Sequence, residues 1–497
     1  MPLLYYSSDF PYYDSVDLGR FTPIVSMEYN FVGLFSTSPF AYFLYHSLQF
    51  IFFAVLLVFL LRKVTSSFPL IYLTSAFLFL LPAFTISWFR LQLPERNAIF
   101  LFAALLLCFY AYLKEERVRY IVFGLLIANL ALYYKETAFL VIGGFGFSYL
   151  VLSWRSSSLK TKIFACLLWF SSLLYLTLYY FLIYLHGTPF VLRAKIYNQA
   201  LVFLKNFLNY ATFSDPILVL LLLPLTFWRA YRVFWRRDPS HPLYDSMLVG
   251  ASLYVIAYFA LGIYGVYYLL PAYIFAIPPL WYYLLPLFRV SRTWNILAFL
   301  ALFFMVVNAI PAGIHYLTYN KYLPLNFNKT LNFLIQDIEA RHPRNRPSIF
   351  LDGVNRGTGA GTYFIFAEFL YSKGLSWDRF DMQSSIEADD PTPLVSKIQP
   401  PLTVFGRGPL SPPQKGDYLV ITPQSTGDTS KAHRESLVKD YELIFQTKST
   451  FAFPRLTLKT LAKYFLARIL PDRQKQQGVL LNENLLEQPD YYVFIKK

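Results

Sequence analysis

The N-terminal segment carries the acids best suited to chemistry at a membrane surface. Asp9, Asp14 and Asp17 lie close together in the sequence, and Glu28 follows them. A carboxylate beside a membrane can act as a general base on an acceptor hydroxyl, or it can ligate a divalent cation. For any one of these acids, the alternative is a solvated loop without a chemical role.

Two basic residues lie next to acids at the ends of apolar runs. Glu95 and Arg96 follow Pro94 at the start of one run, and the Arg96 guanidinium offers a fork suited to phosphate. Lys135 and Glu136 lie in a tight connection, where Lys135 can face a phosphate with Glu136 as its orienting partner. The alternatives are an Arg96 side chain that reaches the lipid headgroups and a structural Lys135–Glu136 ion pair.

Arg193 and Lys195 form a second pair of cations, beside apolar residues in segment 186–213. This arrangement is typical of an interfacial amphipathic helix that grips a lipid-linked phosphate. Attraction to anionic headgroups explains the same residues. The six histidines and two cysteines show no zinc-ligand spacing, so we assign no metal site.

The composition defines the setting of these residues. Of 497 residues, 56% are hydrophobic and only 15% are charged, whereas soluble domains carry about 25% charged residues. These proportions predict a polytopic α-helical membrane protein and exclude a soluble enzyme, a disordered chain and a disulfide scaffold. In such a protein the net charge of +15 indicates cytoplasmic loops rather than nucleic-acid binding.

About ten apolar runs are candidates for transmembrane helices, which need about 20 residues each. They are 42–61, 68–88, 97–113, 120–134, 137–153, 163–185, 214–228, 245–263, 266–286 and 294–313. Every second connection is basic, and the positive-inside rule makes those connections cytoplasmic. Residues 1–41, the loop 186–213 and everything after 314 are then outside. Because residues 1–41 contain no signal peptide, we expect a further helix upstream of Met1.

The sequence therefore predicts three parts: a first outer loop (1–41), a transmembrane domain (42–313) and an extracytoplasmic soluble domain (314–497). The last part is expected to be α/β or α+β. Its predicted strands are Ser348–Leu351 and Tyr418–Ile421, and its predicted helices are Leu331–Arg341, Tyr363–Lys373 and His433–Tyr441.

Four short motifs, all on the predicted outer side, resemble those of the C-type membrane glycosyltransferases. This family includes bacterial relatives of protein mannosyltransferases and of the lipid A aminoarabinose transferase. The motifs cover roughly residues 8–137 and are Ser8-Asp9, Gly19–Pro23 with Glu28–Asn30, Pro94–Asn97 and Tyr134–Glu136. Beyond them the likeness is one of architecture.

The resemblance implies transfer of a sugar from a polyprenyl-phosphate carrier to a lipid, glycan or protein acceptor, on the outer face of the cell membrane. It implies Asp9 as the catalytic base and requires no soluble cofactor. The family often has two adjacent acids at this point, but here Ser8 precedes Asp9, which weakens any role for a divalent cation. Arg96 and Lys135, followed by Arg193 and Lys195, would stabilise the charge on the departing phosphate.

Other function classes remain open. A polymerase or ligase of lipid-linked glycans is close to the main interpretation. A transporter or flippase is a different class, and its usual signature of inverted repeats and acids in mid-membrane is not evident in the sequence. A non-catalytic membrane scaffold, whose outer domain binds a partner, is the third alternative.

Overall fold

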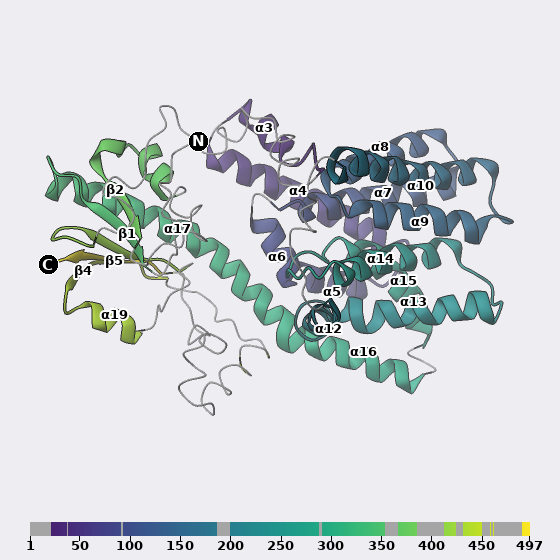
Figure 1. The fold of residues 1–497 in the computed structure, drawn as a ribbon. Coiled ribbons are helices and arrows are strands. Elements are labelled where there is room, and N and C mark those ends of the chain that lie inside the picture. Colours follow the sequence, from purple (N-terminus) through teal and green to yellow (C-terminus); the bar gives the residue numbers. More distant parts are fainter. Residues whose placement is uncertain are drawn as a thin grey trace. The chain divides into compact units, whose positions relative to one another are not determined.

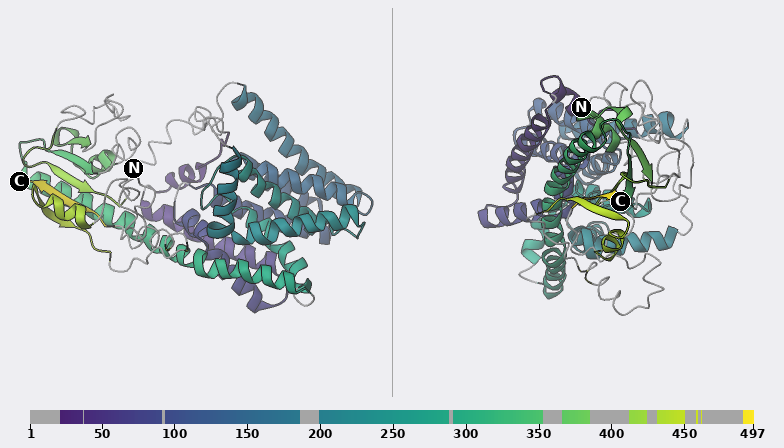
Figure 2. Two further views of the ribbon diagram at one scale, coloured as in Figure 1. Left: turned by 60° about the horizontal axis from the view of Figure 1, so that its bottom comes forward. Right: turned by 90° about the vertical axis from the view of Figure 1, so that its left-hand side faces the viewer.

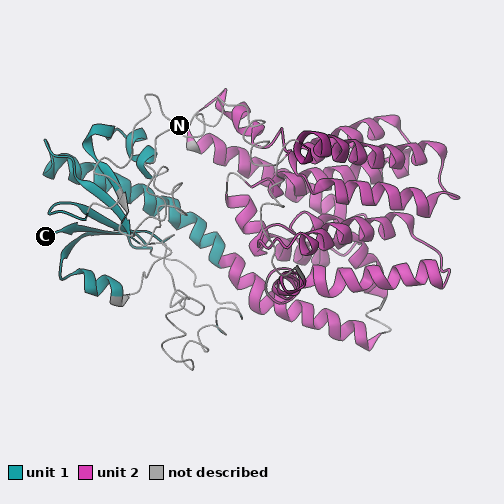
Figure 3. Ribbon diagram, in the orientation of Figure 1, with its two compact units in different colours: residues 1–2, 315–497 teal, residues 3–314 magenta. Residues whose placement is uncertain are grey.

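A computed structural model describes residues 21–36, 38–90, 93–185, 199–287, 291–352, 366–384, 412–423, 431–449, 458, 461 and 490–497. The chain divides into two compact units, with the boundary between Ile314 and His315 (Figure 3). The first unit is helical, and the second is built around a β-sheet.

The first unit is a bundle in which the long helices run side by side (Figure 1 and Figure 2). Its first half contains α3 (Met27–Gly33), α4 (Pro39–Leu61), α5 (Phe68–Phe79), α6 (Pro82–Phe89), α7 (Glu95–Glu115), α8 (Val118–Tyr134), α9 (Ala138–Ser153) and α10 (Leu159–Tyr179), which continues as the π-helix η1 (Tyr180–Tyr184). Its second half contains α12 (Gln199–Asn209), η2 (Tyr210–Ser214), η3 (Leu218–Leu222), α13 (Leu223–Ala230), η4 (Tyr231–Trp235), α14 (Pro242–Ala260), α15 (Ala272–Leu287), α16 (Arg292–Phe304) and η5 (Met305–Ala309), and it ends with the first turn of α17 (Ile310–Arg341).

Several of these helices are suited to crossing a membrane. Among the described residues, six helices are long and apolar enough, or seven if α5 and α6, bent by 65° at their junction, form one broken span. Each of the ten predicted runs contains helix, but α8 and α9 are shorter than the usual span. The structure therefore supports a multi-pass helical protein, while the count of ten crossings stays a prediction.

Small residues allow several of these helices to approach closely. A side chain at Gly250 of α14 would crowd the Val141 carbonyl oxygen of α9, and one at Gly146 of α9 would crowd the Ala165 carbonyl oxygen of α10. Gly313 lies against the backbone at Leu80, where α5 and α6 meet. Such contacts bring helix backbones together in the way typical of membrane proteins.

The second unit is a five-stranded mixed sheet in the order β2-β1-β3-β5-β4. The strands are β1 (Ser348–Asp352), β2 (Asp381–Ser384), β3 (Tyr418–Ile421), β4 (Tyr441–Gln446) and β5 (Tyr492–Lys496). β2, β1 and β3 are parallel, whereas β5 is antiparallel to both β3 and β4. The two predicted strands are confirmed as β1 and β3.

Helices cover both faces of this sheet. The C-terminal half of α17 packs on one face through Leu331, Leu334 and Ile338, and residues 366–372 form a second helix on the same core. On the other face, Leu437 of α19 (Lys431–Leu437) joins a small core with Phe350. The predicted helix His433–Tyr441 was too long, because Tyr441 already begins β4 and pairs with β5. Residues 385–411 lie outside the described residues.

Candidate functional site

A buried cluster of charged and polar side chains forms where α3, α4, α7 and α8 meet at one end of the bundle. Arg96, in the first turn of α7, is fully buried. Its Nη2 donates to the Tyr29 hydroxyl at 2.8 Å and to Glu28 Oε1 at 3.3 Å, and its Nη1 lies 3.0 Å from His46 Nδ1. The guanidinium therefore points into the protein, and the alternative of a side chain that reaches the headgroups is wrong.

Glu28 is the acid of this part of the cluster. Its Oε1 accepts hydrogen bonds from the Tyr134 hydroxyl at 2.5 Å and from Asn97 Nδ2 at 2.8 Å, in addition to the Arg96 contact. Gln49 donates in turn to Asn97 Oδ1. The other carboxylate oxygen, Oε2, is buried and has no hydrogen-bond partner among the described residues. One carboxylate oxygen of Glu28 therefore holds its neighbours in place through hydrogen bonds, and the other can accept a further hydrogen bond.

Lys135 and Glu95 form a second buried ion pair beside the first. Lys135 Nζ lies 2.5 Å from Glu95 Oε1, and the two side chains are 3% and 0% exposed. The sequence predicts its neighbour Glu136 as a partner of Lys135, and the structure shows that Glu95, from the start of α7, makes this ion pair. Lys135 Nζ also lies 5.3 Å from the centre of the Tyr268 ring. Like Glu28, Glu95 keeps an Oε2 that is buried and unpartnered in the described part of the chain.

The local sequence explains how helix ends bring these groups together. α7 begins after Pro94, so its first turn presents Glu95, Arg96 and Asn97, all three of them buried. α8 ends at Tyr134, and Lys135 leaves the helix with an extended backbone. On α4, His46 and Gln49 are three residues apart and therefore share one helix face.

Among the described residues, the formal charges of Glu28 and Glu95 offset those of Arg96 and Lys135. Charges buried without compensation are costly, so this pairing helps to stabilise the buried groups. Burial also raises the pKa of Tyr29 well above its ordinary value, although Arg96 opposes this shift. The Tyr29 hydroxyl therefore stays protonated while it accepts the hydrogen bond from Arg96.

A different buried pair occupies the opposite end of the bundle. There Arg229 Nε and Nη2 donate to Asp245 Oδ1 and Oδ2 at 2.8 and 2.9 Å. Oδ1 also accepts from the Tyr283 hydroxyl at 2.6 Å, and Oδ2 accepts from the His241 amide at 2.9 Å. Both carboxylate oxygens of Asp245 are thus engaged, in contrast to Glu28 and Glu95.

The structure does not describe several of the predicted site residues. Asp9, Asp14, Asp17, Arg193 and Lys195 lie outside the described residues. Within the part that the structure describes, no group of three or more His, Cys, Asp or Glu side chains is arranged to hold a metal ion.

The sequence analysis did not single out His46 and Gln49, and it gave no role to Tyr29 and Tyr134, which lie in two of the quoted motifs. A signal for His46 and Gln49 was present, because they interrupt an otherwise apolar run with helical spacing. Comparison of the chain with protein-family models, curated proteins and solved structures gave no match.

Proposed function

We propose that the helical unit is a membrane glycosyltransferase that moves a sugar from a polyprenyl-phosphate carrier to a lipid, glycan or protein acceptor at the outer face of the cell membrane. The observation that carries the proposal is the pair of buried cations, Arg96 and Lys135, each held by a carboxylate with one oxygen that has no hydrogen-bond partner among the described residues. A departing lipid phosphate gains negative charge, and cations fixed in a water-poor site stabilise it.

In the proposed reaction, one bond to the anomeric carbon forms and another breaks. The acceptor oxygen forms a bond to the anomeric carbon and loses its proton to a carboxylate. The bond between that carbon and the phosphate oxygen breaks, and polyprenyl phosphate leaves with the electron pair. Arg96 and Lys135 bind the phosphate, and Glu95 and Glu28 orient these two cations before the donor arrives. Asp9 is the proposed base, and Asp14, Asp17 and Glu28 are the acids to compare with it. No soluble cofactor takes part.

The position of the cluster supports placement at the outer face. α4 and α7 begin beside the cluster and α8 ends there, so the opposite ends of these helices carry Arg62, Lys63, Lys114, Arg117 and Arg119. The positive-inside rule makes that basic end cytoplasmic. The cluster then belongs to the outer half of the membrane, where lipid-linked sugars are used.

The test is to incubate purified protein in vesicles with a panel of polyprenyl-phosphate sugars and to measure the release of polyprenyl phosphate. We expect release with at least one donor, lost in Arg96→Met and retained in a variant of the opposite pair, Asp245→Asn, once the amount of folded protein is equalised. Passage of intact donor across the vesicle without cleavage would support a flippase instead. No cleavage with any donor by folded protein would reject the transferase.

The acids are tested one at a time in the same assay. Asp9→Asn is expected to abolish release without loss of folded protein, while Asp14→Asn and Asp17→Asn leave release measurable. Full activity in Asp9→Asn would remove Asp9 from the mechanism. If Glu28→Gln alone abolished release while Arg96 still bound donor, Glu28 would be the base.

A further inference from the structure

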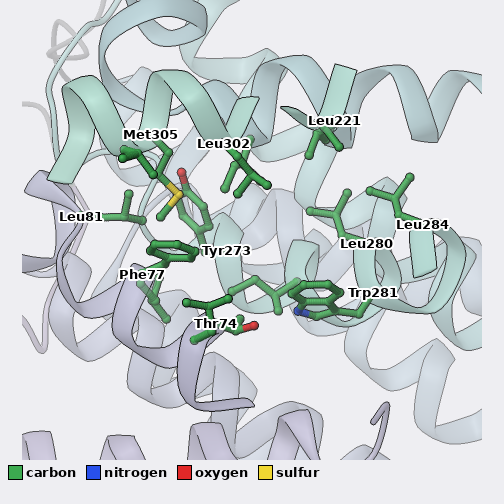
Figure 4. A pocket seen from close by; sticks show the side chains of 16 residues that line it. Thr74, Phe77, Leu81, Leu221, Tyr273, Leu280, Trp281, Leu284, Leu302 and Met305 are labelled. Atoms are coloured by element: carbon green, nitrogen blue, oxygen red, sulfur yellow. The ribbon is translucent and has the colours of Figure 1, made fainter. Parts of the chain in front are cut away.

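The helical unit contains a partly open apolar cavity of about 330 Å³ that has no part in the proposed reaction. It lies between α5, η3, α15 and the α16–η5 segment, and Figure 4 shows side chains from these elements around the space, among them Phe77, Trp281 and Leu302. This volume is at the lower end of the range for ligand pockets, about 300–1,000 Å³. Thr74, one of the few polar lining residues, already donates its hydroxyl to the Leu70 carbonyl oxygen at 2.7 Å.

A buried acid lies behind one wall of this cavity. Asp215 is fully buried between the π-helices η2 and η3, and neither of its carboxylate oxygens has a hydrogen-bond partner among the described residues. Tyr273 lines the cavity, and its hydroxyl interacts electrostatically with Asp215, but the two groups do not reach acceptable hydrogen-bond geometry. A buried acid and a hydroxyl, neither with a geometrically acceptable hydrogen bond among the described residues, therefore lie together at the wall of the cavity that Tyr273 forms.

Three physical arguments point to a ligand at this position. A buried polar group without a partner costs roughly 1–3 kcal/mol, and a charged one costs more, so the arrangement favours binding of a donor. Interruptions of α-helix by π-helix occur frequently at functional sites. Ionisable residues at membrane depth generally line ligand pathways or relays, because they are expensive to keep there.

We propose that this cavity binds an amphiphile whose head is a hydrogen-bond donor, either a hydroxyl or an ammonium group. The head donates to Asp215 and meets the Tyr273 hydroxyl, while the hydrocarbon tail fills the apolar cavity. A phosphate head is excluded because the Asp215 carboxylate would repel it, so this occupant is not a polyprenyl-phosphate carrier. The proposal does not depend on the transferase function.

Trp281 provides the readout because it lines the cavity. Purified protein is titrated with brominated twelve-carbon chains that end in a hydroxyl, an ammonium or a methyl group, and the quenching of Trp281 fluorescence is followed. A Trp281→Phe variant identifies the signal that belongs to this residue. We expect saturable quenching by the hydroxyl or the ammonium probe at concentrations about tenfold or more below those needed for the methyl probe, as one hydrogen bond to a charged group predicts.

The variants separate the possible outcomes. Asp215→Leu and Tyr273→Phe should each remove the preference over the methyl probe, and Ala298→Phe, which fills the cavity, should weaken all three probes. Asp215→Asn keeps an acceptor but loses the charge, so it should retain binding of a hydroxyl head and lose binding of an ammonium head.

Two results would overturn the proposal: equal affinity of the wild-type protein for the methyl and donor-headed probes, or no saturable quenching of Trp281 at all. If Asp215→Leu fails to fold, Tyr273→Phe keeps the test decisive, because it removes only one hydroxyl.

Discussion

Replacing Glu95 by glutamine should damage the protein in two separable ways. The substitution keeps the size of the side chain but removes the charge opposite Lys135, whose Nζ lies 2.5 Å from Glu95 Oε1. Because Lys135 is only 3% exposed, its ammonium then has neither a carboxylate partner at that position nor bulk water. We expect loss of stability from the loss of this ion pair and loss of transfer from the misplaced cation.

The distance between the two charges sets the size of the expected loss of stability. At 2.5 Å and an effective dielectric constant of about 20, the attraction between the two charges is about 7 kcal/mol. Desolvation costs several kcal/mol for each ion, so the net contribution of the intact pair is small. Removing one ion removes the attraction, but the desolvation cost of the remaining ion stays. Such changes destabilise proteins by about 3–5 kcal/mol.

The double variant Glu95→Gln/Lys135→Met separates stability from function. With both charges removed, most of the lost stability should return, whereas release of polyprenyl phosphate should not. The measurements are thermal unfolding in vesicles or detergent and donor cleavage for each folded molecule. The matched control is Asp245→Asn, which leaves Arg229 without its charged partner at the opposite end of the bundle. It should lower stability to a similar degree and leave donor cleavage for each folded molecule near the wild-type value.

Two results would refute this reasoning. If Glu95→Gln were as stable as the wild-type protein, the burial argument for the pair would be wrong. If the double variant cleaved donor normally, Lys135 would be a structural residue, and the phosphate site would have to be sought elsewhere.

Three further predictions follow from particular contacts. Arg96→Lys should reduce donor cleavage by about 10–100-fold, since one ammonium cannot reproduce the contacts with Glu28, Tyr29 and His46; the assay is cleavage at saturating acceptor. Gly313→Val should lower the unfolding temperature markedly, because its Cβ would overlap the Leu80 carbonyl oxygen; the measurement is thermal unfolding of the variant beside the wild-type protein. Chelation with EDTA should leave donor cleavage unchanged, as measured before and after readdition of Mg²⁺.

The sequence predicted which cations belong to this site, but not which acid each cation pairs with. Arg96 and Lys135 stood out because charged residues at the edges of apolar runs are unusual and therefore informative. Glu28 and Glu95 were also candidates, but their pairing with these cations was not predicted, because Glu28 is 68 residues from Arg96 and Glu95 is 40 residues from Lys135. When a helix is apolar on every face, its sequence does not reveal which side meets a neighbour, so contacts between helices depend on packing that a single sequence does not display.

In the second unit, too, the sequence predicted some elements but not those that depend on long-range contacts. β1 and β3 were predictable because each is a continuous apolar run, as buried parallel strands usually are. β4 was not predicted, and only its first residue, Tyr441, fell within a predicted helix, because the residues of β4 alternate weakly and are half exposed. Its identity as a strand depends on pairing with β5, at the far end of the chain. Local sequence carries little information on such long-range pairing.

The two buried ion-pair regions of the helical unit argue for different roles. At the Arg229–Asp245 end, both carboxylate oxygens are engaged by donors, which leaves nothing for a ligand to satisfy. At the other end, Glu28 and Glu95 each have a buried oxygen without a hydrogen-bond partner among the described residues. Such atoms lower the stability of the fold, so stability alone does not explain their presence.

The charge balance at that end adds a constraint on the proposed reaction. Among the described residues, Glu28 and Glu95 already offset Arg96 and Lys135, so an anionic phosphate should bind these cations more readily when negative charge is removed or displaced. The unpartnered oxygens of Glu28 and Glu95 are the sites where such charge can be neutralised, either by a proton or by a donor group of the incoming substrate. Binding of the donor should therefore be accompanied by proton uptake, which calorimetry in buffers of different ionisation enthalpy would measure. Binding without proton uptake would instead require the sugar hydroxyls to contact those two oxygens.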